Sequence, residues 1–389
     1  MSSTFFSITN KYQAFKTFIL FFLLGTVSFL SNVEKSFAEP LRVHFIDIGQ
    51  GDSALIQSPN DKVILIDSGP SKSWKALKGY LDQLNIKEID LMINTHPHSD
   101  HIGNASRILE HFKVKMVLDS GFAHPIRAYS QLLASVKEKK IPLKLGRKGR
   151  TIAIGGGANL ELLAPEEPFI KNSRSDPNSN SIVFRLSYKN QAALFTGDAE
   201  EETETRLLVD SKKLRADLLK VAHHGSKHAS GRAFLDAVKP KYAVVSCSET
   251  NRYGHPAPET LLALNRVQAQ AMVTAQVGSI VASTDGETWQ FTTQRKPSPS
   301  ATINPLKKAQ QISSTNTPNT IQNASAQGKV NVNTASLNEL KTLPRIGPAL
   351  SKRIIEARKD SKFTQASDLR RVRGIGAKTV EKLAPLITF

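Results

Sequence analysis

The sequence predicts an α/β fold, in which two sheets stack with helices outside, followed by a small all-α domain. Three observations support this prediction. Closely spaced strands at the start, as in hairpins, are followed by strands that alternate with helices. After residue 294 the composition becomes polar and loses its hydrophobic period. The segment 329–389 then contains a repeated helix–turn–helix pattern.

The first 38 residues are predicted to be a secretory signal peptide. Two lysines precede the apolar stretch Phe18–Leu30, and Ser36-Phe-Ala38 has the small-x-small pattern at which signal peptidase cleaves. The apolar stretch has 13 residues, whereas a membrane-spanning helix needs about 20. We therefore expect cleavage and a secreted or periplasmic protein that starts near Glu39. An uncleaved anchor is the alternative.

Residues 39–294 are predicted to form the α/β domain. The expected strands are apolar or alternating runs: Arg42–Ile48, Ser53–Gln57, Val63–Asp67, Ile89–Asn94, Val114–Leu118, Asn159–Leu163, Ile182–Ser187, Ala192–Thr196, Leu218–Val221 and Tyr242–Ser246. The expected helices are Trp74–Leu84, 102–112, 128–138, 200–209, 230–238 and 257–266. Cys247 is the single cysteine, which excludes a disulfide framework within the chain. Its apolar surroundings favour a core role over a reactive or metal-binding thiol.

Metal-binding residue types gather in one loop and near the ends of later strands. The loop after Ile89–Asn94 carries three histidines and an aspartate within six residues. A solvated histidine-rich loop is the alternative, but it does not explain the later residues. The candidate ligands are His96, His98, Asp100, His101, Asp198, His223 and His224, with His255 close by. Imidazole and carboxylate without thiolate suit zinc, manganese or iron, and so many ligands predict two divalent ions about 4 Å apart.

Separated motifs carry a resemblance to a known family. His96-Pro-His98-Ser-Asp100-His101 resembles the H-x-H-x-D-H signature of the metallo-β-lactamase superfamily. Five further motifs are similar to the metallo-β-lactamase-like domain of ComEC-type competence channel proteins: Phe45–Ser53, Ile66–Gly69, Phe195–Asp198, Val221–Ser226 and Asn251–Pro256. The resemblance implies an αββα metallo-β-lactamase sandwich and a metal-dependent hydrolase.

The resemblance also implies a role for each candidate ligand. His96 and His98 would hold the first metal, Asp100 and His101 the second, and Asp198 would bridge them. His223 would be the late ligand of the second metal, with His224 as its alternative. Asp67 would orient a ligand histidine, and His255 would lie at the rim, where it contacts a phosphate or passes a proton. Asp100, Asp198 and His255 are the expected catalytic residues.

One departure from the superfamily pattern concerns a further histidine. Many members supply a ligand between the first cluster and the Gly-Asp strand, where this chain has only His111 and His124. We expect His111 to be solvated, and for His124 we keep a surface loop and a metal ligand as alternatives. His44 alternates within a strand, which is typical of a satisfied core histidine. His228 is predicted either to contact substrate or to be solvated.

Residues 295–328 are predicted to be a flexible linker, and residues 329–389 a DNA-binding domain. The linker is rich in Ser, Thr, Asn, Gln and Pro and contains no acidic residue. The domain carries 13 basic and 5 acidic side chains, a net charge of +8 within the +18 of the chain. Its repeat pairs Leu340–Leu350 with Leu369–Thr379, each with a central Ile-Gly turn.

This domain resembles the helix-hairpin-helix domain of ComEA-type DNA uptake receptors. Such hairpins offer turn N–H groups and a helix N-terminus to phosphates, so sequence-independent DNA binding is implied. A bundle that docks a protein is the alternative, and the positive charge favours DNA. The expected DNA-binding residues are Arg345, Gly347, Ala349, Arg373, Gly374, Gly376 and Lys378.

Together these features predict an exported, metal-dependent phosphodiesterase or nuclease that acts on DNA, linked to DNA uptake or degradation. Two alternatives remain open. One is a DNA-binding or uptake protein with a non-catalytic metal site. The other is a hydrolase of another ester, such as a phosphorylcholine ester, a cyclic nucleotide or a lactone.

Overall fold

The computed structural model describes residues 39–296, 329–341, 343 and 346–389. The chain divides into two compact units, Met1–Thr315 and Asn316–Phe389. The predicted signal peptide, 1–38, and all but two residues of the predicted linker, 295–328, lie outside the described residues. Within the described part, none of the helices combines the length and the apolar character that a membrane span requires.

The first unit contains two mixed sheets. The eight-stranded sheet has the order β17 (Trp289–Thr293), β16 (Ile280–Thr284), β1 (Leu41–Phe45), β2 (Ala54–Gln57), β3 (Val63–Ile66), β5 (Leu91–Asn94), β7 (Val117–Asp119) and β8 (Leu143–Leu145). The seven-stranded sheet has the order β15 (Gln270–Val273), β14 (Tyr242–Val245), β13 (Leu218–Lys220), β12 (Gln191–Phe195), β11 (Val183–Tyr188), β10 (Ala158–Ala164) and β9 (Thr151–Gly155). Strands β3, β5, β7 and β8 are mutually parallel, and so are β12 to β15.

The two sheets pack face to face through a buried apolar core. Phe195 of β12 lies between Phe184 and Phe45, with ring centroids 4.7 Å and 6.0 Å away. Phe45 belongs to the first sheet and the other two rings to the second, so this stack joins the sheets. Each such aromatic pair contributes about 0.5–1.5 kcal/mol beyond its burial.

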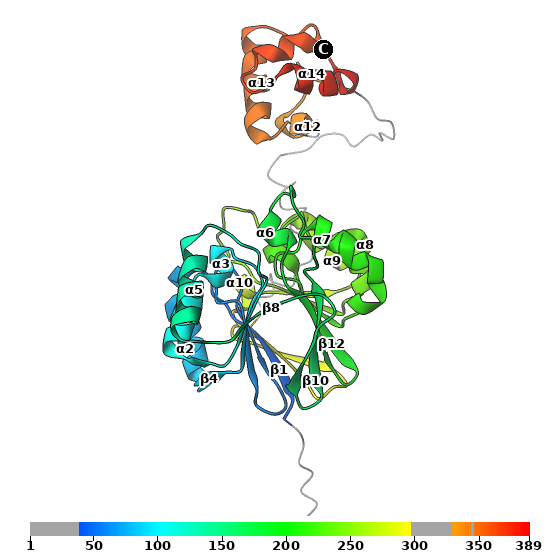
Figure 1. Cartoon of the computed structure of the whole chain (residues 1–389). Coiled ribbons are helices and arrows are strands. Elements are labelled where there is room, and N and C mark those ends of the chain that lie inside the picture. The colour runs from blue at the N-terminus through cyan, green and yellow to red at the C-terminus, as the bar shows by residue number, and fades with distance from the viewer. Residues whose placement is uncertain (1–38, 297–328, 342, 344–345) are drawn as a thin grey trace, which may run out of the picture. The chain divides into compact units, whose positions relative to one another are not determined.

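Helices cover the outer face of each sheet, as Figure 1 shows. On the eight-stranded sheet, buried side chains of α2 (Trp74–Gln83), α4 (Ala105–His111) and α5 (Arg127–Glu138) form a second apolar cluster. On the seven-stranded sheet, α7 (Glu201–Leu207), α8 (Arg232–Val238) and α9 (Pro258–Arg266) form a third. The predicted αββα arrangement is confirmed. Cys247 is fully buried in the third cluster, as expected of a core residue.

Three predicted elements are broken in the structure. The strand predicted at Ile89–Asn94 is interrupted at Asp90, which lies between β4 (Glu88–Ile89) and β5. The strand predicted at Val114–Leu118 is divided between β6 (Lys113–Val114), which pairs with β4, and β7. The helix predicted at 102–112 begins earlier and is split into α3 (Ser99–Ile102) and α4. Gly103 lies at this break, and a Cβ there would overlap the Gly69 carbonyl oxygen at 2.8 Å. The close approach of the Gly69 turn therefore requires glycine at this position.

The second unit is helical. Its main elements are α12 (Leu337–Lys341), α13 (Pro348–Asp360), the 3₁₀ turn η4 (Ala366–Arg371) and α14 (Ala377–Leu383), with β18 (Val330–Asn331) paired to β19 (Ile387–Thr388). The two hairpins of the sequence repeat have matching cores, because Ile346 and Ile375 are both buried. Gly347 and Gly376 are the N-cap residues of α13 and α14.

Candidate metal centre

The candidate ligands lie at the carboxyl ends of parallel strands in both sheets. Asp67 follows β3, and the loop from His96 to His101 follows β5, its parallel neighbour. Asp198 follows β12, and His223 and His224 follow the parallel strand β13. Since the carboxyl ends of parallel strands meet at one edge, residues far apart in the sequence converge there.

The Asp198 carboxylate is the centre of this convergence. Its Oδ2 atom lies 3.3 Å from Nε2 of His101, 3.6 Å from Nε2 of His224, and 3.8 Å from Nε2 of both His96 and His223. Asp198, His96, His101 and His224 are almost fully buried, and the His223 side chain is 24% exposed. Four histidine nitrogens therefore surround one buried oxygen of Asp198.

His98 and Asp100 complete the first cluster on the solvent side. Nδ1 of His98 lies 3.1 Å from Nε2 of His96, and Oδ2 of Asp100 lies 3.4 Å from Nε2 of His224. The His255 ring, from the loop after β14, has its centroid 5.5 Å from that of His223. The structure thus brings together all of the predicted ligands and places His255 beside them.

Asp67 holds the His101 ring from behind. One carboxylate oxygen of Asp67 accepts hydrogen bonds from Nδ1 of His101, at 2.8 Å, and from Oγ1 of Thr95, at 2.7 Å. The other oxygen accepts the Thr95 backbone N–H at 2.8 Å. With a proton on Nδ1, the Nε2 lone pair of His101 points toward Asp198, which is the tautomer a metal ligand requires.

Two residues that sequence reasoning missed lie under the site. Nζ of Lys220 is 2.8 Å from Oδ2 of Asp52, and both side chains are over 90% buried. Oδ1 of Asp52 lies 3.2 Å from Nδ1 of His224. Ligand atoms of Asp52, His101, Asp198 and His224 all lie within 4.8 Å of one another. A lysine in the otherwise apolar run Leu218–Val221 was the available signal, since a buried lysine needs a carboxylate partner.

Glu200 is a third residue that the sequence prediction missed. Its Oε1 atom lies 3.0 Å from Nδ1 of His223 and accepts a hydrogen bond from Nδ2 of Asn178 at 3.2 Å. Glu200 also lines a neighbouring hollow of about 420 Å³ together with Arg174 and His228. His228 therefore lies beside the centre, in a position compatible with either of its predicted roles. Glu200 is only two residues from Asp198, yet no motif marked it.

The residues present fit divalent cations. Among the described residues, Nε2 of His101, Nε2 of His224 and Oδ1 of Asp198 are buried without a hydrogen-bond partner. Buried polar atoms of this kind need a partner, and these donor types are the ones that zinc and manganese accept. Asp67, His223 and His224 also have left-handed backbones, with φ of 55°, 48° and 54°. Such strain costs about 1–3 kcal/mol per residue and is typical of functional sites.

The histidines and carboxylates of the centre shift one another's pKa values. Burial lowers the pKa of His96 well below its usual value. Burial opposes a charge on His101 too, but the Asp198 and Asp67 carboxylates outweigh it and raise the pKa of His101 well above the usual value. Burial and the neighbouring histidines lower the pKa of His255 to about 4. A metal binding at His101 must therefore displace a proton.

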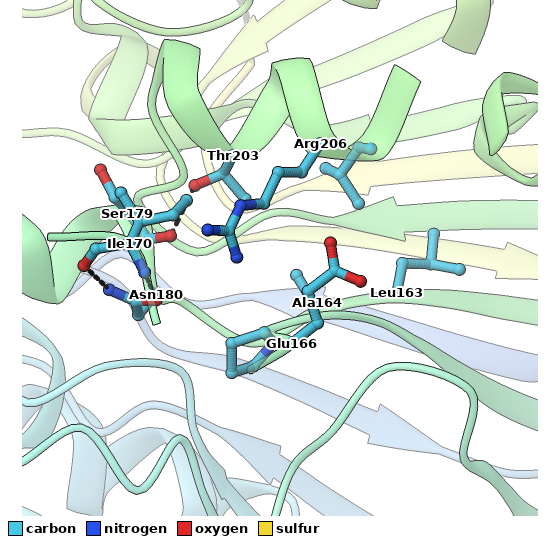
Figure 2. Close-up of a pocket in the computed structure, with 10 residues that line it drawn as sticks. Leu163, Ala164, Glu166, Ile170, Ser179, Asn180, Thr203 and Arg206 are labelled. Carbon is cyan, nitrogen blue, oxygen red and sulfur yellow. Dashed lines mark hydrogen bonds between the residues drawn. The ribbon is translucent and has the colours of Figure 1, made fainter. Parts of the chain in front are cut away.

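The centre opens to solvent through a cleft of about 290 Å³. The lining residues are Gln50, His98, Ser99, Asp100, Ile126, Asn178, Asp198, His223, His224, Tyr253 and His255. Figure 2 shows a different hollow, next to Thr203 and Arg206, in which Nδ2 of Asn180 donates to the Ile170 carbonyl. That hollow has a volume of about 10 Å³, enough for one water molecule, so it is not a substrate site.

Three other histidines have defined places. His124 lies beside His98, with ring centroids 5.5 Å apart, which favours the ligand alternative over the surface loop. His111 is exposed and packs on the Trp74 ring, away from the centre. His44 is buried between the Tyr80 hydroxyl, at 3.0 Å, and Oε1 of Gln57, at 2.9 Å, as expected of a satisfied core histidine.

The predicted DNA-binding residues lie at the two hairpins of the second unit. Arg345 is outside the described residues, and the side chains of Ala349 and Lys378 are not described. Gly347 and Gly376 are exposed, with open space where a Cβ would stand. Gly374 has φ of +103°, which favours glycine. Arg373 is exposed, and its carbonyl accepts a hydrogen bond from Arg353 at 2.8 Å, which links the two hairpins.

Comparison with known protein families gives two matches. Residues 46–249 match the Metallo-beta-lactamase superfamily, and residues 325–388 match the helix-hairpin-helix motif. These two matches correspond to the two units of the structure.

Curated relatives match the same two parts. ComE operon protein 3 of Bacillus subtilis is 32% identical over 66% of this chain and 34% of its own length. Recombination protein 2 of Haemophilus influenzae is 28% identical over 61% of this chain and 28% of its own. ComE operon protein 1 of Bacillus subtilis is 40% identical over 15% of this chain and 29% of its own. The chain spans about a third of the length of the relatives that match its larger unit.

Proposed function

The chain belongs to the metallo-β-lactamase superfamily, with a domain of the ComEC type, and from this premise we propose that it is an exported, metal-dependent phosphodiesterase that cleaves DNA. The observation that carries the proposal is the convergence of four histidines on the Asp198 carboxylate at the floor of an open cleft. The helix-hairpin-helix motif in the same chain supports DNA as the substrate. A further relative, 28% identical over 58% of this chain, is named Competence protein ComA of Neisseria gonorrhoeae, which supports a link to competence.

We assign the candidate ligands to two divalent ions, zinc or manganese. The first would be held by His96 and His98, with His124 beside them, and Asp198 would be shared. The second would be held by Asp100, His101 and Asp198, with His223 or His224 as the late ligand. Such a pair of ions supplies an activated water and neutralises charge on a phosphoryl group.

The side chains at the cleft would handle the phosphate and the proton. His255 is neutral at neutral pH because burial lowers its pKa to about 4, so its ring can donate a hydrogen bond to a phosphate oxygen but is a weak base for passing a proton. Lys220 is not available for this role, because its ammonium group is buried against Asp52.

The second unit would bind the phosphate backbone without reading sequence. The exposed caps Gly347 and Gly376 and the exposed Arg373 lie at its two hairpins. Its net charge of +8, from 13 basic and 5 acidic side chains, supports an anionic partner. A binding unit in the same chain raises the local concentration of substrate at the cleft.

The test uses the protein from Glu39, freed of metal, with labelled single- and double-stranded DNA and with zinc or manganese added back. Asp198→Ala is compared with Asp210→Ala, a matched change at an exposed aspartate. Metal-dependent cleavage that only Asp198→Ala abolishes would support the proposal. Tight, salt-sensitive DNA binding without cleavage would instead place the protein among uptake receptors. Hydrolysis of phosphorylcholine esters, cyclic nucleotides or lactones alone would indicate another ester substrate.

A further inference from the structure

Tyr253 is an exposed aromatic side chain at the mouth of the candidate metal centre. Seven large apolar side chains are exposed among the described residues, and of these only Tyr253 lines the cleft. The residue is 55% exposed. Tyrosine is enriched at binding interfaces, because its ring offers apolar area while its hydroxyl keeps a polar partner.

The loop around Tyr253 is fixed by hydrogen bonds. Oδ1 of Asn251 accepts the backbone N–H groups of Tyr253, at 3.2 Å, and of His255, at 2.9 Å. Nδ2 of Asn251 donates to the carbonyls of Ser248, at 2.9 Å, and of His255, at 2.7 Å. The exposed position of the ring is therefore built into the loop, and a ligand would meet a preorganised surface.

The ring also has a defined position relative to the metal centre. Its centroid is 5.6 Å from that of His255, with an angle of 25° between the planes, and His255 is 5.5 Å from His223. Arg252 lies over the ring, with Cζ 5.0 Å from the centroid and Nη2 2.9 Å from the hydroxyl oxygen. The Tyr253 ring and the Arg252 guanidinium thus lie together, and only the His255 ring separates them from the candidate ligand His223.

We propose that Tyr253 stacks on the base of the nucleotide next to the scissile phosphate and makes the site prefer single-stranded DNA. The inference rests on the proposed function and names its substrate class more closely. Bases stack on protein aromatic rings whatever their identity, and Arg252 adds a cation for the adjoining phosphate. In a duplex the faces of the bases are covered by neighbouring pairs, so an unpaired strand can use this surface and an intact duplex cannot.

The first test compares Tyr253→Ala, Tyr253→Phe and the control Leu262→Ala, which changes an exposed apolar residue on α9 outside the cleft. The substrates are one single-stranded oligonucleotide, its duplex, and the same strand with one abasic position next to the cleaved bond. Tyr253→Ala should lower kcat/KM for the intact single strand by about 5- to 150-fold, the range that loss of one stacked base gives. It should leave the abasic strand unaffected, and Tyr253→Phe should retain the preference for single strands.

A different outcome would overturn the inference. If Tyr253→Ala slows the intact and the abasic strand equally, the ring only positions His255 and does not stack on a base.

The second test does not depend on cleavage. A single strand containing 5-iodouracil is irradiated with the metal-free chain, and the cross-linked peptide is identified by mass spectrometry. A cross-link at Tyr253 supports stacking even if no DNA is cleaved and the proposed function fails. Cross-links confined to residues 329–389 refute it.

Discussion

Replacing Asp67 by asparagine should weaken metal binding by inverting the tautomer of His101. In the structure one oxygen of Asp67 accepts the Thr95 N–H, and the other accepts both Thr95 Oγ1 and Nδ1 of His101. An asparagine keeps its partners only if its oxygen faces the Thr95 N–H and its NH₂ faces His101. The NH₂ then donates to Nδ1 of His101, so Nδ1 must be unprotonated and the ring keeps its proton on Nε2, the atom that faces Asp198.

The magnitude follows from the alternative orientation. A metal at Nε2 would require the original tautomer, and the amide would then have to turn its NH₂ toward the Thr95 N–H. Two buried donors would face each other, and leaving one unpaired costs about 1–3 kcal/mol. Metal affinity should therefore fall by about 5- to 150-fold, which includes the range found when an orienting partner of a ligand histidine is lost.

The assay is competition for zinc with a chromophoric chelator, at constant pH and ionic strength. Asp82→Asn, at an exposed position of α2, is the matched control and should bind zinc as the unaltered chain does. Thermal unfolding of both metal-free variants shows whether the fold is retained. Unchanged zinc affinity in a folded Asp67→Asn variant would refute the assignment of Asp67 as the residue that orients His101.

Three further predictions concern the ion pair under the site, a buried histidine and the DNA-binding unit. Lys220→Met removes the ammonium partner of the buried Asp52 carboxylate and should lower the free energy of unfolding by about 3 kcal/mol, the lower end for a broken buried pair, because His224 still faces the carboxylate. Lys78→Met, in an exposed pair, should cost less than about 1 kcal/mol, and equal losses in urea denaturation would contradict the reasoning. Burial lowers the pKa of His44 to about 4, so the unfolded chain alone binds this proton between pH 6.5 and 4, and about 3 kcal/mol of stability should be lost over that range. In His44→Gln, denaturation midpoints should fall less between pH 7 and pH 4 than in the unaltered chain. Arg373→Gln should reduce by about 1 the slope of log affinity for DNA against log salt concentration, measured by fluorescence anisotropy; an unchanged slope would remove Arg373 from the phosphate contacts.

The periodicity of apolar residues in the sequence predicted the central strands well and the edge strands poorly. Strands such as β5 and β12 are buried on both faces, so their sequences are continuous apolar runs. The edge strands that were not predicted, among them β8 and β17, have mostly exposed or half-buried side chains. The strand β16 was also missed, although its alternate side chains are buried. Their pairing is set by neighbours far away in the sequence, as where β16 pairs with β1, and no local pattern records it.

The ligands were predictable because their residue types are costly to bury without a purpose. His96 and Asp198 lie just after apolar strands and His101 lies in the short helix α3, and all three are buried, which a metal or an ion pair explains. Asp52 and Glu200 were missed because carboxylates in loops are ordinary on a protein surface. Only the folded chain shows that each one faces a ring nitrogen of a histidine after β13.

The glycine-rich motif near the start of the chain contributes geometry more than chemistry. The backbone N–H of Asp52 donates to the Asp100 carbonyl at 3.1 Å, and the Asp52 carbonyl accepts the Gly69 N–H at 2.9 Å. This loop therefore joins the turn after β3 to the ligand loop after β5. Gly51 makes the contact possible, because its φ of +136° favours glycine and a Cβ there would overlap the Asp100 carbonyl oxygen. A motif with no ligand in the predicted set thus joins the turn that carries Asp67 to the loop that carries the candidate ligands, and it gives Asp52 its place against His224.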